Sequence, residues 1–229
     1  MRKKKNEDIC VIGAGRFGSA VISQLAKTEC SLMLIDKSED HLKSYVDVAE
    51  KIVIADAADI KALKALNVQD MDTVVVAVSD NIEIVASLLE LKVSNIIARA
   101  TSKRHALVLK QIGVNVIIQP EYEAGIRTAL LATNTNFLKY SKDLQEIGDG
   151  FVMGTTLITN EDLLGKAIKD LKFNELGISI VLIKRGSEFI LPNGFSVLEK
   201  DDLLTILGKV ADVNHAISEL NKTKEKEEE

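Results

Sequence analysis

The 229-residue sequence contains no tryptophan, and aromatic residues make up only 4% of it. Proteins that bind single-stranded nucleic acids stack bases on aromatic side chains, and this chain offers few such faces. Its formal net charge of −5 also disfavours a partner with a phosphate backbone. We therefore expect no nucleic-acid partner.

Long apolar runs are absent as well. No stretch approaches the roughly 18–20 apolar residues that a membrane-spanning helix requires. The basic start, Arg2–Lys5, leads directly into Asn6-Glu7-Asp8 and not into the apolar core of a signal peptide. We therefore expect a cytoplasmic protein with a solvated basic start, the alternative being that this start contacts anionic lipid.

Cysteine is scarce, with Cys10 and Cys30 as the two examples. Both fall in or beside expected buried strands, where cysteine behaves as a small apolar residue; a redox pair is the alternative. A chain of this length can bury about 70% of its unfolded surface without a disulfide or a metal. Two domains are the first expectation.

Short β-branched runs alternate with helical stretches between residues 8 and 132. Strands buried on both faces of a parallel sheet are nearly continuous in Val, Ile and Leu. Strand–helix alternation predicts right-handed crossovers with helices on both faces of the sheet. The six runs match the doubly wound, Rossmann-type α/β fold. The expected strands are Ile9–Ile12, Leu32–Ile35, Ile52–Ala55, Thr73–Val78, Asn95–Arg99 and Val114–Ile118.

The pattern changes after a further expected helix, Glu121–Ala132. Closely spaced strand signals and a turn at Lys184-Arg185-Gly186-Ser187 predict a small α+β domain. Its expected strands are Phe151–Ile158, Ser179–Lys184, Glu188–Leu191 and Leu203–Leu207, and its expected helices are Leu163–Leu171 and Val210–Leu220. We predict a Rossmann domain over residues 1–135, a connection over 136–150, the α+β domain over 151–222 and a charged, disordered tail over 223–229.

Gly13, Gly15 and Gly18 form the pattern G-x-G-x-x-G between the first expected strand and the first expected helix. Gly13 permits a tight turn, Gly15 lets a pyrophosphate approach the backbone, and Gly18 lets the helix pack close to the strand. Phosphates would meet unpaired N–H groups and the positive end of the helix dipole. Asp36 ends the second expected strand about twenty residues later, where a carboxylate binds a ribose and repels a 2′-phosphate. This spacing predicts NAD(H) or an adenine nucleotide, although Asp36 as a simple turn cap is the alternative.

Further polar residues follow the other expected strands, at the sheet edge where doubly wound folds bind ligands. Asp56 follows the third strand, Ser79 and Asp80 follow the fourth, and Arg99 ends the fifth. Asp80 could instead cap the following helix, and Arg99 could instead be a surface charge. Arg16 lies inside the glycine loop, where its charge favours a terminal phosphate and therefore ATP or ADP.

Catalytic motifs are not evident in the sequence. A dehydrogenase needs a general acid or base near the nicotinamide. We expect none of the three histidines, His41, His105 and His215, to lie beside a strand end with a carboxylate that orients it. No zinc spacing, nucleophile elbow or Walker lysine occurs. The sequence therefore disfavours an enzyme, although a small NAD-dependent oxidoreductase stays an alternative, as does a nucleotide-binding scaffold for another partner.

Several motifs together resemble the RCK (KTN) regulators, the cytosolic gating subunits of Trk/Ktr potassium uptake systems (TrkA/KtrA-like). The arginine inside the glycine loop, followed by Phe-Gly, is the most specific of them. The resemblance covers nearly the whole chain, since the second domain resembles the C-terminal RCK (TrkA-C) domain. The matching motifs are Gly13-Ala14-Gly15-Arg16-Phe17-Gly18, Asp36, Ile54-Ala55-Asp56-Ala57, Val76-Ala77-Val78-Ser79 and Gln119-Pro120-Glu121.

The resemblance implies a non-enzymatic subunit that assembles from dimers into octameric rings. Such rings lie beneath a membrane-embedded potassium-translocating subunit, at the inner face of the membrane. The implied regulatory ligand is ATP, ADP or NAD(H), with phosphates at Arg16, ribose at Asp36 and the adenine end at Asp56. The implied nucleotide-site residues are Gly13, Gly15, Arg16, Phe17, Gly18, Asp36, Lys37, Asp56, Ala57, Ala77, Ser79, Asp80 and Arg99.

Two further sites are implied only by the resemblance. Glu121 matches a glutamate that in some relatives helps hold a divalent cation, Mg²⁺ or Ca²⁺, between nucleotides of neighbouring subunits. Arg185, with Phe189, Ile190 and Pro192, is similar to the pattern that binds cyclic di-AMP in the C-terminal domain of some relatives. The stretch from Asn136 onward departs from the family in being polar.

Overall fold

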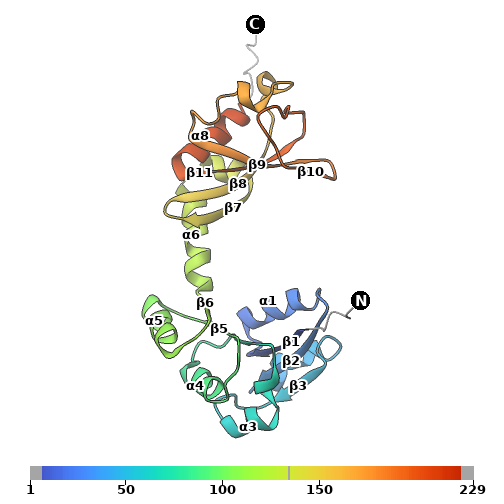
Figure 1. Cartoon of the computed structure of the whole chain (residues 1–229), viewed down its shortest axis with the longest axis vertical. Coiled ribbons are helices and arrows are strands. Elements are labelled where there is room, and N and C mark those ends of the chain that lie inside the picture. Colours follow the sequence, from blue (N-terminus) through green and yellow to red (C-terminus); the bar gives the residue numbers. More distant parts are fainter. Residues whose placement is uncertain (1–6, 134, 223–229) are drawn as a thin grey trace. The chain divides into compact units, whose positions relative to one another are not determined.

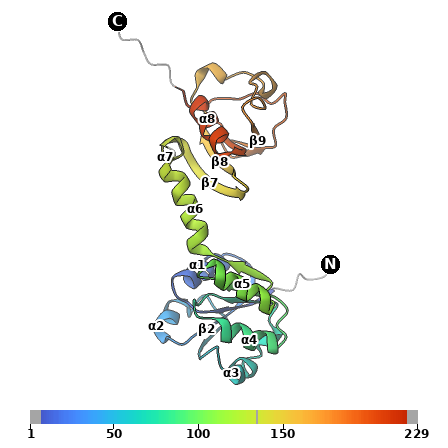
Figure 2. The same ribbon diagram turned by 90° about the vertical axis from the view of Figure 1, so that its left-hand side faces the viewer.

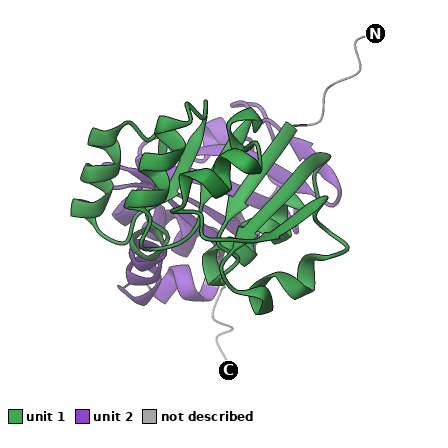
Figure 3. Ribbon diagram, turned by 90° about the horizontal axis from the view of Figure 1, so that it is seen from below, with its two compact units in different colours: residues 1–123 green, residues 124–229 purple. Residues whose placement is uncertain are grey.

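The computed structural model describes residues 7–133 and 135–222. The chain folds as two compact units, which divide between Glu123 and Ala124 (Figure 3). Each unit has a hydrophobic core of its own. Within the described residues, no helix has both the length and the apolar character that crossing a bilayer requires.

The first unit contains a six-stranded parallel sheet with the order β3-β2-β1-β4-β5-β6 (Figure 1). The strand order reverses between β1 and β4, and β1 pairs with both β2 and β4 in parallel register. This arrangement confirms the predicted doubly wound fold and its six strands. The strands are β1 (Glu7–Ile12), β2 (Cys30–Asp36), β3 (Lys51–Ile54), β4 (Thr73–Val76), β5 (Ile96–Arg99) and β6 (Val116–Ile118).

Alternating side chains of the sheet pack against helices on its two faces. Val11 and Leu34 pack with Ile22 of α1 (Arg16–Leu25), on the face that also carries α2 (Glu39–Leu42). The other face packs against α3 (Ile60–Ala65), α4 (Ile82–Glu90) and α5 (Lys103–Ile112). Figure 1 shows α1 on the opposite side of the sheet from α3 and α4. Because both faces are covered, the strands are apolar throughout.

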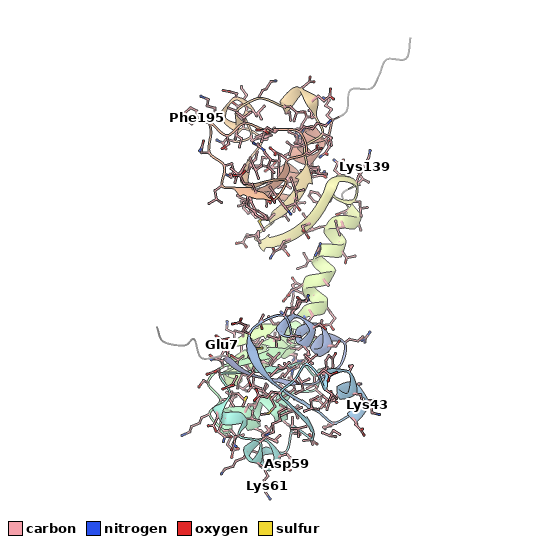
Figure 4. The ribbon with its side chains drawn as sticks, turned by 90° about the vertical axis from the view of Figure 1, so that its right-hand side faces the viewer. Glu7, Lys43, Asp59, Lys61, Lys139 and Phe195 are labelled. Atoms are coloured by element: carbon pink, nitrogen blue, oxygen red, sulfur yellow. The ribbon has the colours of Figure 1, made fainter. Side chains whose placement is uncertain are left out.

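Local sequence determines where some of these helices begin. Asp59 caps α3, because its carboxylate accepts a hydrogen bond of 2.9 Å from the backbone N–H of Lys61. Figure 4 shows both residues at the start of that helix. Ser102 caps α5 in the same way, through the N–H of His105. α5 then ends at Gly113, which takes the left-handed conformation typical of a helix C-terminus.

Both cysteines are free thiols, as expected for small core residues. Cys10 is fully buried in β1, and burial raises the pKa of its thiol to about 12. A thiol that stays protonated is a poor nucleophile, so Cys10 serves as packing. The Sγ of Cys30 lies 3.7 Å from the carbonyl oxygen of Leu25.

The second unit is built on an antiparallel sheet with the order β10-β9-β11-β8-β7. Helix α8 (Val210–Leu220) packs on β8 and β11. Figure 2 shows this helix beside β8. Its core centres on Phe137, Ile183, Leu204 and Ile217, all fully buried. The unit's elements are α6 (Pro120–Thr133), which begins in the first unit, α7 (Thr135–Tyr140), β7 (Ser141–Gly148), β8 (Phe151–Leu157), β9 (Ile178–Arg185), β10 (Glu188–Ile190) and β11 (Leu203–Lys209).

Residues 136–150, which we predicted to be a connection, instead contribute α7 and β7 to the second unit. Phe137 and Leu144 are buried in its core. The strand was missed because its outward positions are polar and its apolar signal is short. A turn containing Asp149 joins β7 to β8, with positive φ angles at Gly148, Asp149 and Gly150. The division between the units lies within α6, ahead of the predicted boundary at residue 135.

The predicted helix Leu163–Leu171 is wrong. The structure contains two short 3₁₀ turns there, Glu161–Leu163 and Ile168–Asp170. Gly165 lies between them with a φ of +75°, which a continuous right-handed helix cannot contain. The predicted hairpin is present, because β9 pairs with β10 across Gly186 and Ser187. The expected tail 223–229 and the basic start Met1–Lys5 lie outside the described residues.

Candidate functional site

A cavity of about 380 Å³ opens at the carboxyl ends of the parallel strands. It lies where the strand order reverses, the position at which open α/β sheets bind ligands. Most of the predicted nucleotide-site residues line it. They are Gly13, Gly15, Arg16, Phe17, Asp36, Lys37, Ala57, Ala77, Ser79, Asp80 and Arg99. Gly18, Asp56, Glu121 and Arg185 are not among its lining residues.

Two glycines of the loop are required by the fold. Gly13 has a φ of +95°, and a Cβ there would lie 2.5 Å from the Cγ1 of Val78. A Cβ on Gly18 would lie 1.8 Å from the carbonyl oxygen of Gly13. A side chain at Gly13 would therefore force the loop away from Val78, and one at Gly18 would force the first turn of α1 away from Gly13. This confirms the packing role predicted for Gly18.

Gly15 is different, because nothing in the protein requires it to be glycine. Its φ of −69° and ψ of −168° describe ordinary extended backbone, which any residue can adopt. A Cβ built on it would meet no atom within 4 Å. It precedes α1, whose first turn has no acidic residue and begins with Arg16. The loop therefore leaves open space beside a positive helix end, where an anion can approach the backbone.

Asp36 fastens the glycine loop to the end of β2. Its Oδ2 accepts a hydrogen bond of 2.7 Å from the N–H of Ala14, and its Oδ1 accepts one of 2.8 Å from the N–H of Ser38. Burial raises the pKa of this carboxyl, but these two N–H groups and His41 outweigh it, so the pKa is lower than usual. Asp36 is therefore ionised at neutral pH and faces the cavity.

His41 corrects an expectation drawn from the sequence. Its Nδ1 lies 3.2 Å from Oδ2 and 3.3 Å from Oδ1 of Asp36, so it does lie beside a strand end with a carboxylate. It also lines the cavity, with about half of its side chain exposed. The sequence signal was a histidine five residues after the strand-end acid, on the first turn of the next helix.

Asp56 lies at the rim of the cavity, outside its lining. Its carboxylate forms an ion pair of 3.1 Å with the Nζ of Lys37 and accepts a hydrogen bond of 2.9 Å from the N–H of Ala58. That N–H, followed by Lys37, lowers the pKa of Asp56. Lys37 follows β2 and Asp56 follows β3, so the pair joins the ends of neighbouring strands.

Arg99 is not a simple surface charge, because it lines the cavity and its side chain is only 21% exposed. Its guanidinium forms an ion pair with Glu121 and lies 6.0 Å from the centroid of the Phe17 ring. The backbone N–H of Glu121 itself, and then Arg99, lower the pKa of Glu121. Within the described residues, no three His, Cys, Asp or Glu side chains gather as metal ligands.

Asn81, which the sequence reasoning missed, joins the ends of β4 and β5. It is the N-cap residue of α4, where Asp80 was the predicted alternative cap. Its buried Nδ2 donates to the carbonyl oxygens of Val78 and Arg99, at 3.0 and 2.8 Å. Its Oδ1 lies 3.0 Å from the Nε2 of His105. The amide therefore fixes the ends of β4 and β5 relative to each other.

Apolar side chains between these polar groups were also missed. Ile12, Ile35, Ala55, Val78 and Ile84 line the cavity beside them. Each except Ile84 lies at or just beyond the end of a strand, next to a residue that was predicted. Their surfaces give the cavity an apolar part of the kind that a flat ring system can pack against.

Arg185 belongs to the second unit and is held by its own chain. Its Nε and Nη2 each donate to the carboxylate of Asp202 at 2.8 Å, and Nη2 also donates to the carbonyl oxygen of Val197. Asp202 is fully buried. Burial makes the largest single contribution to the pKa of Asp202 and raises it. The hydrogen bond from Arg185 acts in the opposite direction, and the pKa is lower than usual overall. A cavity of about 260 Å³ in this unit has Lys169 among its lining residues, but not Arg185.

Two domain families match the sequence of this chain. The TrkA-N domain matches residues 9–120 and the TrkA-C domain matches residues 152–221. Ktr system potassium uptake protein C of Bacillus subtilis is 33% identical over 214 residues, covering 91% of this chain and 95% of that protein. Ktr system potassium uptake protein A of the same organism is 30% identical over 219 residues, covering 93% and 96%.

Solved structures show the same fold. The GsuK channel matches with a TM-score of 0.63 and 18% identity, and the GsuK channel bound to NAD matches with 0.59 and 16%. Both comparisons cover 100% of this chain and 42% of the channel chain. These identities support the fold alone, whereas the Bacillus proteins match along almost their full lengths. The chain belongs to the family of TrkA-N/TrkA-C potassium uptake proteins that includes Ktr system proteins A and C.

Proposed function

We propose that the chain is a nucleotide-sensing regulatory subunit of a membrane-embedded potassium transporter. In this proposal the first unit binds an adenine nucleotide or NAD(H), and binding shifts the conformation of a ring of subunits that gates the transporter. The relatives that match over the full chain are named potassium uptake proteins. The subunit would then be peripheral to the inner face of the membrane through its partner.

The observation that carries the proposal is Gly15. Neither backbone conformation nor packing requires this glycine, and it lines the cavity at the start of α1, so the space of its missing Cβ is open to a ligand. A pyrophosphate against the start of α1 meets this need, because it accepts hydrogen bonds from free N–H groups at the positive end of the helix. Arg16, the first residue of α1, would add a full positive charge.

The remaining cavity groups suit the other parts of a nucleotide. The ionised carboxylate of Asp36 can accept hydrogen bonds from ribose hydroxyls and disfavours a 2′-phosphate. The apolar surfaces of Ile35, Ala55 and Ala57 can pack against a base. We place the adenine end near the Lys37–Asp56 pair, at the rim.

Arg16 and Arg99 favour nucleotides that carry terminal phosphates, so we propose ATP and ADP ahead of NAD(H). We further propose, from the resemblance, that Glu121 holds a divalent cation when nucleotide is bound. The cation would then replace Arg99 as the partner of Glu121. A cyclic di-AMP site in the second unit is proposed on the same basis, and Arg185 would shape it by holding the Val197–Asp202 loop.

In a ring of coupled subunits, a small preference of the ligand for one ring state at each site is sufficient to shift the whole ring. If ATP prefers one ring state over the other about tenfold at each site, the preference is about 1.4 kcal/mol per site. Eight coupled sites would contribute about 11 kcal/mol, which exceeds the roughly 5.5 kcal/mol that shifts an equilibrium from 1:99 to 99:1. We therefore propose a homo-oligomeric assembly, up to an octamer, as the functional form.

A ligand panel tests the binding proposal. Isothermal calorimetry and thermal unfolding are measured with ATP, ADP, NAD⁺, NADH and cyclic di-AMP, with and without Mg²⁺ or Ca²⁺. We expect stabilisation by ATP or ADP in the wild type and none in Gly15→Val. Gly125→Ala, another glycine with open space around it, should bind like the wild type. If no nucleotide binds the wild type, the sensor proposal is wrong.

Two further measurements separate the alternatives. A small oxidoreductase would require NAD(H) and would consume it in the presence of a substrate, whereas a gate would respond differently to ATP and ADP. Potassium flux into vesicles that contain this protein and its membrane partner should therefore change when ADP replaces ATP. Flux that is the same with either nucleotide, although both bind, would contradict the gating proposal and favour a scaffold.

A further inference from the structure

His41 and Asp36 contact each other in the lining of the cavity. The Nδ1 of His41 lies 3.2 Å from Oδ2 and 3.3 Å from Oδ1 of the Asp36 carboxylate. The backbone N–H groups of Ala14 and Ser38 bind the same carboxylate and belong to the segments it holds together. His41 is the partner whose side chain is half exposed and can move away.

We propose that His41 is a clasp that competes with the ribose for Asp36, so that nucleotide affinity depends on pH. This inference rests on the proposed nucleotide site. Ribose hydroxyls can reach both oxygens of Asp36 only when the imidazole has moved away from them. The protonated ring holds the carboxylate as an ion pair, and the neutral ring holds it by a weaker hydrogen bond. Acidification therefore favours the clasped, ligand-free state.

The other ionisable groups around His41 are carboxylates, lysines and arginines. Asp36 is the acid that faces it, and the pKa of Asp36 is below its usual value. Lys37 is paired with Asp56, and Asp40 is paired with Lys43. The cavity wall adds the charged residues Arg16, Asp80 and Arg99. Carboxylic, lysine and arginine side chains in general titrate far from pH 6–8, whereas imidazole titrates near about 6.5.

Another histidine near the cavity does not act in this way. The ring of His105 faces Asn81 and Thr101 and not Asp36. Its Nδ1 accepts from the N–H of Thr101 at 3.3 Å, which leaves Nε2 to donate to Asn81. It remains in place in any variant at position 41, so its contribution cancels when that variant is compared with the wild type.

The size of the effect follows from mass action. Nucleotide binds only the unclasped fraction, so its apparent Kd rises by the factor that the clasp imposes. An exposed ion pair strengthens an association by about two- to fivefold. We therefore expect the Kd of wild type to exceed that of His41→Ala by about two- to fivefold at pH 6, and the two values to converge at pH 8.

The test measures Kd by calorimetry for ADP and for NAD⁺ at pH 6, 7 and 8, in wild type, His41→Ala and His215→Ala. The ratio of two Kd values at one pH cancels the ligand's own titration. His215 is an exposed helical histidine of the second unit, so His215→Ala should follow the wild type. Binding of either ligand to wild type at pH 6 should also release a fraction of a proton per site, seen as heat that varies with the buffer, and His41→Ala should release less.

The outcomes separate this inference from the nucleotide site itself. If wild type binds neither ligand at any pH, the nucleotide-site proposal fails. If wild type binds but its Kd ratio to His41→Ala does not change with pH, His41 is not a clasp. Weaker binding by His41→Ala at pH 6 would also overturn the inference, because His41 would then be a contact for the nucleotide.

Discussion

Gly18→Ala provides a sharp test of how the glycine loop is packed. The added methyl group would lie 1.8 Å from the carbonyl oxygen of Gly13, and ordinary contact begins at about 3.4 Å. The first turn of α1 must therefore move from β1 by about 1.6 Å, although Ile22 of the same helix is fully buried against the sheet. Overpacking of this kind costs typically 1–3 kcal/mol and occasionally more.

The better helix propensity of alanine offsets part of that cost, by up to about 1 kcal/mol. We therefore expect Gly18→Ala to destabilise the first unit by about 2 kcal/mol. Gly15→Ala is the matched control in the same loop, because its methyl group meets no atom within 4 Å. Alanine is a poorer N-cap than glycine, but it also lowers the entropy of the unfolded chain, and these effects nearly cancel.

The assay is urea unfolding followed by hydrogen exchange of peptides from β1 and α1. Peptide resolution is needed because the two units need not unfold in one transition. Exchange in the second unit serves as the internal reference. Equal stability of Gly18→Ala and wild type would refute the packing argument. Equal losses in Gly18→Ala and Gly15→Ala would refute the claim that Gly15 is free of steric demands.

Three further predictions concern other parts of the chain. Asn81→Ala should destabilise the first unit by about 2–3 kcal/mol in urea unfolding, because buried carbonyl groups and the ring of His105 lose their partner. Asp202→Asn should destabilise the second unit by about 3 kcal/mol at pH 7, because Arg185 loses a buried charged partner. Burial raises the pKa of Asp202, but the hydrogen bonds from Arg185 and from the N–H of Glu199, together with the charge of Arg185, lower it by more. In the wild type this stabilisation is therefore present above the unfolded value of about 3.9 and is lost as pH falls through the lower folded value. Unfolding measured between pH 2 and 7 should therefore show that the second unit loses stability in acid, and that this loss is smaller in Asp202→Asn. Gly125→Ala should raise helix stability by about 0.5–1 kcal/mol, seen as slower exchange in α6, because the added methyl group has open space.

Features set by short stretches of sequence could be predicted well. Apolar runs and helical spacing predicted the parallel sheet, since each run needs burial on both faces. Three glycines and Asp36 predicted the loop and the acid that faces the cavity. These predictions depend on residues that are neighbours along the chain or at the ends of adjacent strands.

Features that depend on side chains from separate elements could not be predicted. The pairing of His41 with Asp36 depends on where α2 begins after β2. The bonds of Asn81 depend on the spacing between β4 and β5 and on α5. Strand β7 was missed for a local reason. Its outward positions are polar, so the buried Leu144 did not stand out as part of an apolar run.

The proposed function depends most on the space beside Gly15 being kept open for phosphates. A crystal structure of the protein grown with ADP or ATP would test it most directly. We expect phosphate density against the N–H groups at the start of α1, with the ribose at Asp36 in place of His41. Nucleotide bound elsewhere, or a cavity filled by the protein's own side chains at saturating nucleotide, would contradict it.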